Sequence, residues 1–205
     1  MSRLGRKVRL AIATTRGPSV VAGFSFDEEA RRSQIVRYDE SHIAHGADEE
    51  HFHGFDERLR AELRRRGYPL PREPLVFEVD GGVDAGASWQ VGLAAAYLLW
   101  SAGRLALDGE PADGAVLATG RLGTSGWRAR GVEGVAEKAA RGAAFLAEAA
   151  PERRLFVLPA ENAGEAAGCA IEDLGRLAAV LGVRRARPRR RLAPRVAAGI
   201  ALAAL

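Results

Sequence analysis

Ser88 and Lys138 are the residues of this sequence whose types and surroundings best suit covalent catalysis. Ser88 ends a Gly-rich turn and opens a long apolar stretch, residues 86–100. A serine hydroxyl is a weak nucleophile until a neighbouring base takes its proton. The N–H groups at a helix start can stabilise the oxyanion that then forms. The same position also suits a serine that only caps the helix, so other residues must decide between the two roles.

The scarcity of lysine makes Lys138 a candidate base. The chain has 30 basic residues, and only Lys7 and Lys138 among them are lysines. Arginine stays protonated in proteins, whereas a buried lysine can lose its proton and accept another. Small or apolar residues lie three and four positions away along a predicted helix and would let another element cover the amine: Gly134, Val135 and Gly142. The alternative is a surface lysine paired with Glu133 or Glu137.

Strands and helices that alternate along the chain would position these two residues. The sequence predicts strands at residues 7–15, 19–26, 33–39, 74–82, 114–122, 126–132 and 153–160. It predicts helices at residues 56–67, from Ser88 to about Ser101, at 133–150 and at 170–182, and a polar loop at 48–55. Segments 114–122 and 126–132 would pair as a hairpin around "GTSG". The alternation with a central hairpin predicts a single α+β or mixed α/β domain.

Four pieces of sequence, in this order, resemble the proteolytic domain of Lon-type proteases. They are the Gly turn with Ser88, then "ATGRLGTSGWRARGVEG", "AEKAARGA" and "FVLPAEN". The resemblance covers residues 74–165, about half the chain, and implies a single Lon-protease-like domain with a β-α-β core. It implies that Ser88 is the nucleophile and Lys138 the general base. The family threonine falls on Thr119, which would hydrogen-bond the amine and orient it.

The resemblance implies a serine endopeptidase with a Ser-Lys dyad, acting on protein or peptide substrates without a cofactor. Its base works only as a neutral amine, so cleavage would increase with pH. No Walker pattern occurs in the chain, so hydrolysis would be independent of ATP and limited to flexible or unfolded segments. The family assembles into rings, which implies a homo-oligomer.

The turn around the serine departs from the family pattern. The family sequence is Asp-Gly-Pro-Ser-Ala-Gly, whereas this chain has Ala85-Gly86-Ala87-Ser88-Trp89-Gln90, with the acid displaced to Asp84. We expect the bulky Trp89 to narrow the substrate cleft or to change the oxyanion geometry. Trp89 and Gln90 also leave open a catalytically inactive Lon-like domain that acts as a scaffold. A third interpretation is a phosphate cradle, although such motifs usually hold more glycines and serines.

The four histidines fall within one short acidic segment, "HIAHGADEEHFH", as His42, His45, His51 and His53. Histidines in a short loop can bind zinc, but this spacing matches no standard closed site and no cysteine lies nearby. A solvated acidic loop is the simpler interpretation, and we therefore expect no metal site. Metal binding by these histidines is the alternative.

The basic residues concentrate near the C-terminus. Residues 184–195 contain seven arginines, more than the formal net charge of +4, so the rest of the chain is mildly acidic and we expect no nucleic-acid partner. Residues 196–205 are apolar but shorter than the roughly 20 residues of a membrane span. An arginine-rich linker before an apolar run is typical of the cytoplasmic edge of a membrane helix. A disordered basic tail that touches anionic lipid is the alternative.

Composition favours an ordinary folded domain at residues 1–183. Hydrophobic residues make up 47% of the chain and charged residues 27%. Cys169 is the one cysteine, so no internal disulfide forms and a reducing cytoplasm is the simplest location. The basic N-terminus has too short an apolar run for a signal peptide. We therefore expect a cytoplasmic domain, anchored at the inner face of the membrane if residues 196–205 begin a spanning helix.

Overall fold

A computed structural model describes residues 4–29, 31–37, 49–84 and 86–185, which form a mixed α/β fold around a seven-stranded sheet. The strand order is β3-β4-β2-β1-β5-β8-β9. The β1–β5, β3–β4, β5–β8 and β8–β9 pairs are parallel, and the β1–β2 and β2–β4 pairs are antiparallel. The strands are β1 (Val8–Thr14), β2 (Gly17–Phe26), β3 (Gln34–Arg37), β4 (Leu75–Val79), β5 (Gly114–Ala118), β8 (Arg154–Pro159) and β9 (Cys169–Ile171).

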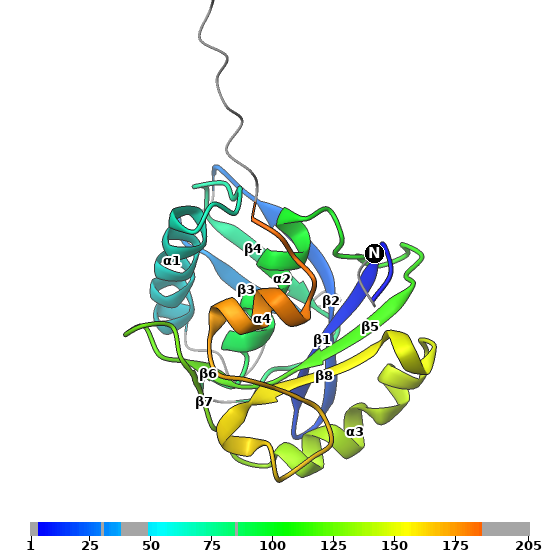
Figure 1. Ribbon diagram of the computed structural model, residues 1–205. Coiled ribbons are helices and arrows are strands. Elements are labelled where there is room, and N and C mark those ends of the chain that lie inside the picture. Colours follow the sequence, from blue (N-terminus) through cyan, green and yellow to red (C-terminus); the bar gives the residue numbers. More distant parts are fainter. Residues whose placement is uncertain (1–3, 30, 38–48, 85, 186–205) are drawn as a thin grey trace, which may run out of the picture.

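Helices cover both faces of the sheet (Figure 1). The helices are α1 (Glu49–Arg65), α2 (Gln90–Ser101), α3 (Val135–Ala147) and α4 (Leu174–Val180), with short 3-10 turns at η1 (Pro151–Arg153) and η2 (Ala160–Asn162). One core cluster joins α1, α2 and α4 to one face, and a smaller cluster joins α3 to the other. A small hairpin, β6 (Arg121–Leu122) with β7 (Ala129–Arg130), leaves the end of β5. The mixed α/β class and the central hairpin are confirmed.

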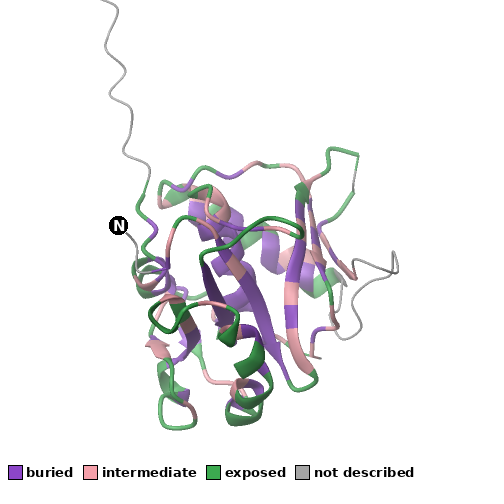
Figure 2. Cartoon of the chain, turned by 90° about the vertical axis from the view of Figure 1, so that its right-hand side faces the viewer, coloured by how far each residue is buried: buried purple, intermediate pink, exposed green. Residues whose placement is uncertain are grey.

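Alternation along β1 explains the two layers. Leu10 and Ile12 belong to the α2 side of the core, whereas Ala11 and Ala13 belong to the α3 side. Helix α2 is buried almost all round, as its apolar sequence predicts, and Figure 2 shows it against the buried central strands. The layers pack closely at glycines. A Cβ at Gly142 of α3 would lie 2.2 Å from Leu117 Cδ2 of β5, so a larger residue there would force either the Leu117 side chain or the helix to move.

Two expected elements were wrong. Residues 48–55 were expected to be a loop, but α1 already begins at Glu49. The first turns are helical because Phe52 and Phe55 extend the buried apolar face of the same helix that Leu59 and Leu63 continue. The helix expected at 170–182 begins only at Leu174, after Asp173, whose side chain accepts a hydrogen bond from Arg176 N and caps the helix. The residues before it form β9, which pairs with β8.

No helix in the described part of the chain is long and apolar enough to cross a membrane. The segment on which the expected anchor depends, residues 196–205, lies outside the described residues, as does the linker from residue 186 onward. The start of that linker, Arg184 and Arg185, is exposed.

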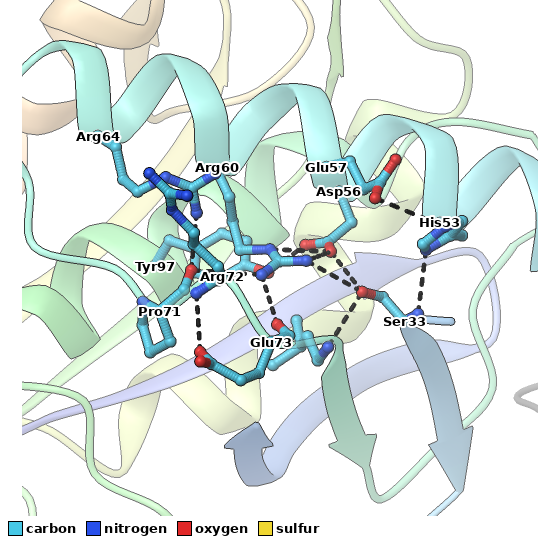
Figure 3. A network of polar contacts seen from close by, with 11 residues as sticks. Ser33, His53, Asp56, Glu57, Arg60, Arg64, Pro71, Arg72, Glu73 and Tyr97 are labelled. Atoms are coloured by element: carbon cyan, nitrogen blue, oxygen red, sulfur yellow. Dashed lines mark hydrogen bonds and ion pairs between the residues drawn. The ribbon is translucent and has the colours of Figure 1, made fainter. Parts of the chain in front are cut away.

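A buried ionic network attaches α1 to the sheet and to α2 (Figure 3). The Asp56 carboxylate is completely buried and accepts hydrogen bonds from Arg60 at 2.7 Å, from Ser33 at 2.5 Å and from the Tyr97 hydroxyl. The Ser33 hydroxyl in turn accepts from Leu75 N of β4 at 3.0 Å. Burial raises the pKa of Tyr97 well above its usual value, and the Asp56 carboxylate raises it further, so the phenol stays a neutral donor.

Asp56→Asn should lower the free energy of unfolding by about 3 kcal/mol, because it leaves the Arg60 guanidinium buried without a countercharge. Urea-induced unfolding measures the loss. Glu57→Gln is the matched control on the next residue of α1. Glu57 is exposed, and its Oε1 lies 3.8 Å from His53 Nε2, which is a long and weak ionic contact. We therefore expect the free energy of unfolding to change by no more than about 0.5 kcal/mol. Equal effects of the two substitutions would contradict a stabilising role for the network.

Candidate active site

Ser88 lies in the wall of a cavity of about 830 Å³ that opens where the Gly-rich turn before α2, the β1–β2 turn and the start of α3 meet. The side chain is 7% exposed. Trp89, not Ser88, occupies the N-cap position of α2, and no side chain caps that helix. The Ser88 hydroxyl has no hydrogen bond to any described residue. Ser88 is therefore not an N-cap, and it lines the cavity with a hydroxyl that no described residue binds.

Backbone contacts fix the turn against the end of β5. Gly120 N donates to Ser88 O at 2.9 Å, and Val91 N donates to Gly120 O at 3.1 Å. Gly120 has a φ of +136°, and a Cβ there would lie 2.7 Å from Pro159 and 2.9 Å from Val91. Glycine is thus required at this position on both conformational and steric grounds. These bonds leave the backbone N–H groups of Ser88 and Trp89 without an acceptor among the described residues.

Lys138 lines the same cavity from the first turn of α3 and is 4% exposed. Its amine forms an ion pair with Asp84, with 3.2 Å between Nζ and Oδ2. The surface alternative is wrong, because Glu137 pairs with Arg141 instead. Asp84 is held by Thr15, whose backbone N and hydroxyl donate to Oδ1 at 3.1 and 2.9 Å.

Thr119 lies at the end of β5 and is completely buried. Its side chain follows Leu117 on the face that packs against α3, and Gly142 of α3 sits on Leu117. Helix α3 connects the parallel strands β5 and β8, so it runs antiparallel to β5. Lys138 lies one helical turn before Gly142 and is therefore at the level of Thr119, which lies two residues after Leu117. The expected hydrogen bond from Thr119 to the amine is not formed. The Thr119 hydroxyl has no partner within the described residues, and Asp84 holds the lysine instead.

Trp89 does not narrow the cavity, contrary to expectation. The ring is 1% exposed and points away from the cavity into α1, where it packs against Phe52 and Phe55 with ring centroids 5.1 and 5.3 Å apart. Its indole N–H donates to Gly86 O at 2.7 Å, which closes the turn that carries Ser88. The large residue was expected in the cleft because the sequence gives its size but not its direction.

Trp89→Phe should lower the free energy of unfolding by about 1–2 kcal/mol, because it keeps a packed ring but leaves the Gly86 carbonyl without its donor. Since the ring does not line the cavity, KM for any peptide substrate should stay within about twofold of the wild-type value. Denaturant unfolding and steady-state kinetics measure the two effects. A strong fall in KM, as expected from a widened cleft, would contradict this placement of the ring.

Of the described histidines, His51 lines the cavity and contacts Gln90, whereas His53 does not line it. Gln90 Oε1 accepts from Leu122 N of β6 at 2.8 Å, and Gln90 Nε2 lies 3.3 Å from His51 Nε2. His51 lines the cavity, whereas His53 Nδ1 accepts from Ser33 N at 3.1 Å on another side of α1. No group of three potential metal ligands occurs among the residues the structure describes. His42 and His45 lie outside them.

The sequence did not predict the ion pair between Lys138 and Asp84. It also did not predict that Thr15 holds Asp84 by hydrogen bonds. It also missed Arg16 and Arg121, which line the cavity. Asp84 was noticed only as a displaced acid, and nothing in the sequence links it to Thr15 or to Lys138.

Comparison with protein-family models gives no match for this chain, and comparison with curated proteins gives none. The function must therefore be argued from the site itself.

Proposed function

We propose that this chain is a Lon-like serine endopeptidase that hydrolyses peptide bonds through Ser88 and Lys138. The observation that supports this best is the shared cavity. A serine hydroxyl without a described hydrogen-bond partner, from the turn before α2, and a buried lysine amine, from α3, line one cavity. The backbone N–H groups of Ser88 and of the next residue, Trp89, have no acceptor among the described residues. A nucleophile, a base and oxyanion donors are the three parts that acyl transfer requires.

In this proposal Ser88 Oγ attacks the carbonyl carbon of the scissile bond while neutral Lys138 takes the hydroxyl proton. The N–H groups of Ser88 and Trp89 would donate to the oxyanion, aided by the positive end of the α2 dipole. Lys138 then gives its proton to the leaving amine, and the C–N bond breaks to leave an acyl-Ser88 ester. A water that gives a proton to the same amine attacks the ester carbonyl. The C–O bond to Ser88 then breaks, the amine returns that proton to Ser88 Oγ, and the carboxylic acid product is released.

Asp84 has a separate part in the proposal. It compensates the ammonium charge of Lys138, which would otherwise be buried without a partner. The amine must lose its proton and turn from Asp84 to Ser88 before it can act as a base. The unpartnered hydroxyl of Thr119 offers a second contact for the amine in that position. Because proton loss precedes the reaction, we expect hydrolysis to increase with pH.

The substrate would be a flexible or unfolded polypeptide, and hydrolysis would need neither ATP nor a cofactor. The resemblance to Lon-type domains supports a homo-oligomer, in which several cavities would act on one chain.

One observation favours a second function, that of an inactive scaffold with the same fold. Lys138 is paired with Asp84 and makes no hydrogen bond to Ser88 in this structure. If the ion pair never opens, Ser88 stays unactivated and the cavity serves only for binding.

An assay on an unfolded protein separates the two functions. The purified chain is incubated without nucleotide with a reduced, carboxymethylated protein, and new peptide termini are identified by mass spectrometry. The peptidase predicts internal cleavages that appear with the wild-type chain and are absent with Ser88→Ala. Identical fragment patterns for the two proteins, or no fragments from either, would favour the scaffold.

A further inference from the structure

We infer that the Ser88 cavity holds a subsite for an acidic side chain of the substrate polypeptide, formed by Arg121 and Arg16. Arg121 is the first residue of β6, and Arg16 lies in the β1–β2 turn; both line the cavity that contains Ser88. The inference rests on the proposed function for its substrate, a polypeptide, and adds the chemistry of the residue that the cavity selects.

Within the described ranges neither guanidinium group is bonded directly to a carboxylate, and Arg121 acts on Glu161 only through its charge, which helps to lower the pKa of that carboxyl. Arg16 and Arg121 are exposed, and neither side chain forms a hydrogen bond or a salt bridge within the described ranges. A guanidinium presents planar N–H donors that match the two oxygens of a carboxylate. An incoming Asp or Glu side chain is the natural partner for such groups beside a cavity.

The neighbour of Arg121 shows the contrast. Arg130 of β7 stands directly opposite Arg121 in the hairpin register. Arg130 Nη1 lies 3.2 Å from Glu161 Oε1, and the other oxygen of Glu161 accepts from Gly131 N at 2.6 Å. The hydrogen bond from Gly131 N, and then that from Arg130, lower the pKa of Glu161 and keep it charged. Glu161 is thus bonded to Arg130, which does not line the cavity. Arg121 lines the cavity, and no carboxylate among the described residues is bonded to it.

The charges that line the cavity favour an anion. Lys138 and Asp84 compensate each other as an ion pair. Of the other lining groups with a fixed charge, Arg16 and Arg121 are positive and Glu133 alone is negative. A basic substrate residue would therefore meet repulsion where an acidic one finds donors.

Binding of matched peptides tests the subsite without relying on cleavage. Three fluorescein-labelled peptides differ only in their central residues, which are Asp, Ala or Lys, and bind to the Ser88→Ala chain in a fluorescence anisotropy titration at low salt. We expect the Asp peptide to bind about tenfold more tightly than the Lys peptide. Arg121→Ala should remove most of that preference, and Arg121→Glu should reverse it in favour of Lys.

Arg130→Ala is the matched control, since it removes the same charge from the facing strand but from outside the cavity. It should leave the preference unchanged. Equal affinities for the three peptides, or equal effects of Arg121→Ala and Arg130→Ala, would overturn the subsite. Circular dichroism melts show whether each variant is folded, and the reversed preference of Arg121→Glu cannot arise from unfolding.

Cleavage of the same peptides by the wild-type chain separates this inference from the proposed function. Cleavage of all three at similar rates would support a peptidase and overturn the subsite. Arg121-dependent binding of the Asp peptide without any cleavage would support the subsite and overturn the peptidase. Preferred cleavage of the Asp peptide that Arg121→Ala abolishes supports both.

Discussion

Ser88→Ala should lower the rate of peptide hydrolysis by roughly 10⁴-fold or more, because it removes the atom that would form the acyl-enzyme in the proposed mechanism. The fold should be unaffected. The hydroxyl makes no hydrogen bond to a described residue, and the turn is fixed by backbone bonds through Ser88 O and Gly120. Initial rates on an unfolded protein measure the loss, and urea unfolding shows whether stability is retained.

Ser101→Ala is the matched control at the other end of α2. The Ser101 hydroxyl donates to Leu98 O at 2.9 Å, so its loss costs a helical hydrogen bond but touches no part of the cavity. We expect full activity from this variant. Retention of more than about a tenth of the activity in Ser88→Ala would show that another group performs the reaction.

Lys138→Arg should abolish hydrolysis to a similar extent, because a guanidinium stays protonated and cannot accept the serine proton. It keeps the positive charge beside Asp84, so it tests the base and not merely the ion pair. The longer side chain can cost about 1–3 kcal/mol in a buried site. Lys138→Met has a similar volume and no charge, so it removes the base without overpacking the site. Initial rates of hydrolysis are compared for both variants.

Lys7→Arg is the control for lysine replacement in general. Lys7 pairs with Glu110 at 2.9 Å and lies outside the cavity, so its variant should hydrolyse substrate at the wild-type rate. Activity in Lys138→Arg close to that of Lys7→Arg would exclude Lys138 as the base.

Much of the fold was predictable because local patterns of apolar and polar residues determine several of its elements. Alternating and β-branched residues marked β1 and β2, and the apolar run after Ser88 marked α2. The start of α1 was not predicted because Phe52 and Phe55 are surrounded in the sequence by polar residues and Gly54. The two rings form a buried apolar face only through their packing against Trp89, which is distant in the sequence. Strand β9 was missed because three residues carry almost no periodicity, and only pairing with β8 defines it.

The candidate site was predictable in its residue types but not in its contacts. Ser88 and Lys138 were chosen from chemistry and order along the chain, and the structure places both at one cavity. The partner of Lys138 could not be predicted, since the Asp84 contact depends on how α3 packs beside the Gly-rich turn before α2 and on support from Thr15. Such long-range pairs leave no trace in the spacing of residues.

The central claim is that Lys138 activates Ser88, and covalent labelling of the serine tests it most directly. A fluorophosphonate forms an O–P bond to an activated serine and releases fluoride, and peptide mapping by mass spectrometry gives the rate at each serine. We expect Ser88 in the wild-type chain to react at least about 100-fold faster than Ser101, and this advantage to disappear in Lys138→Met. Labelling of Ser88 no faster than Ser101, or at the same rate in Lys138→Met, would contradict the dyad.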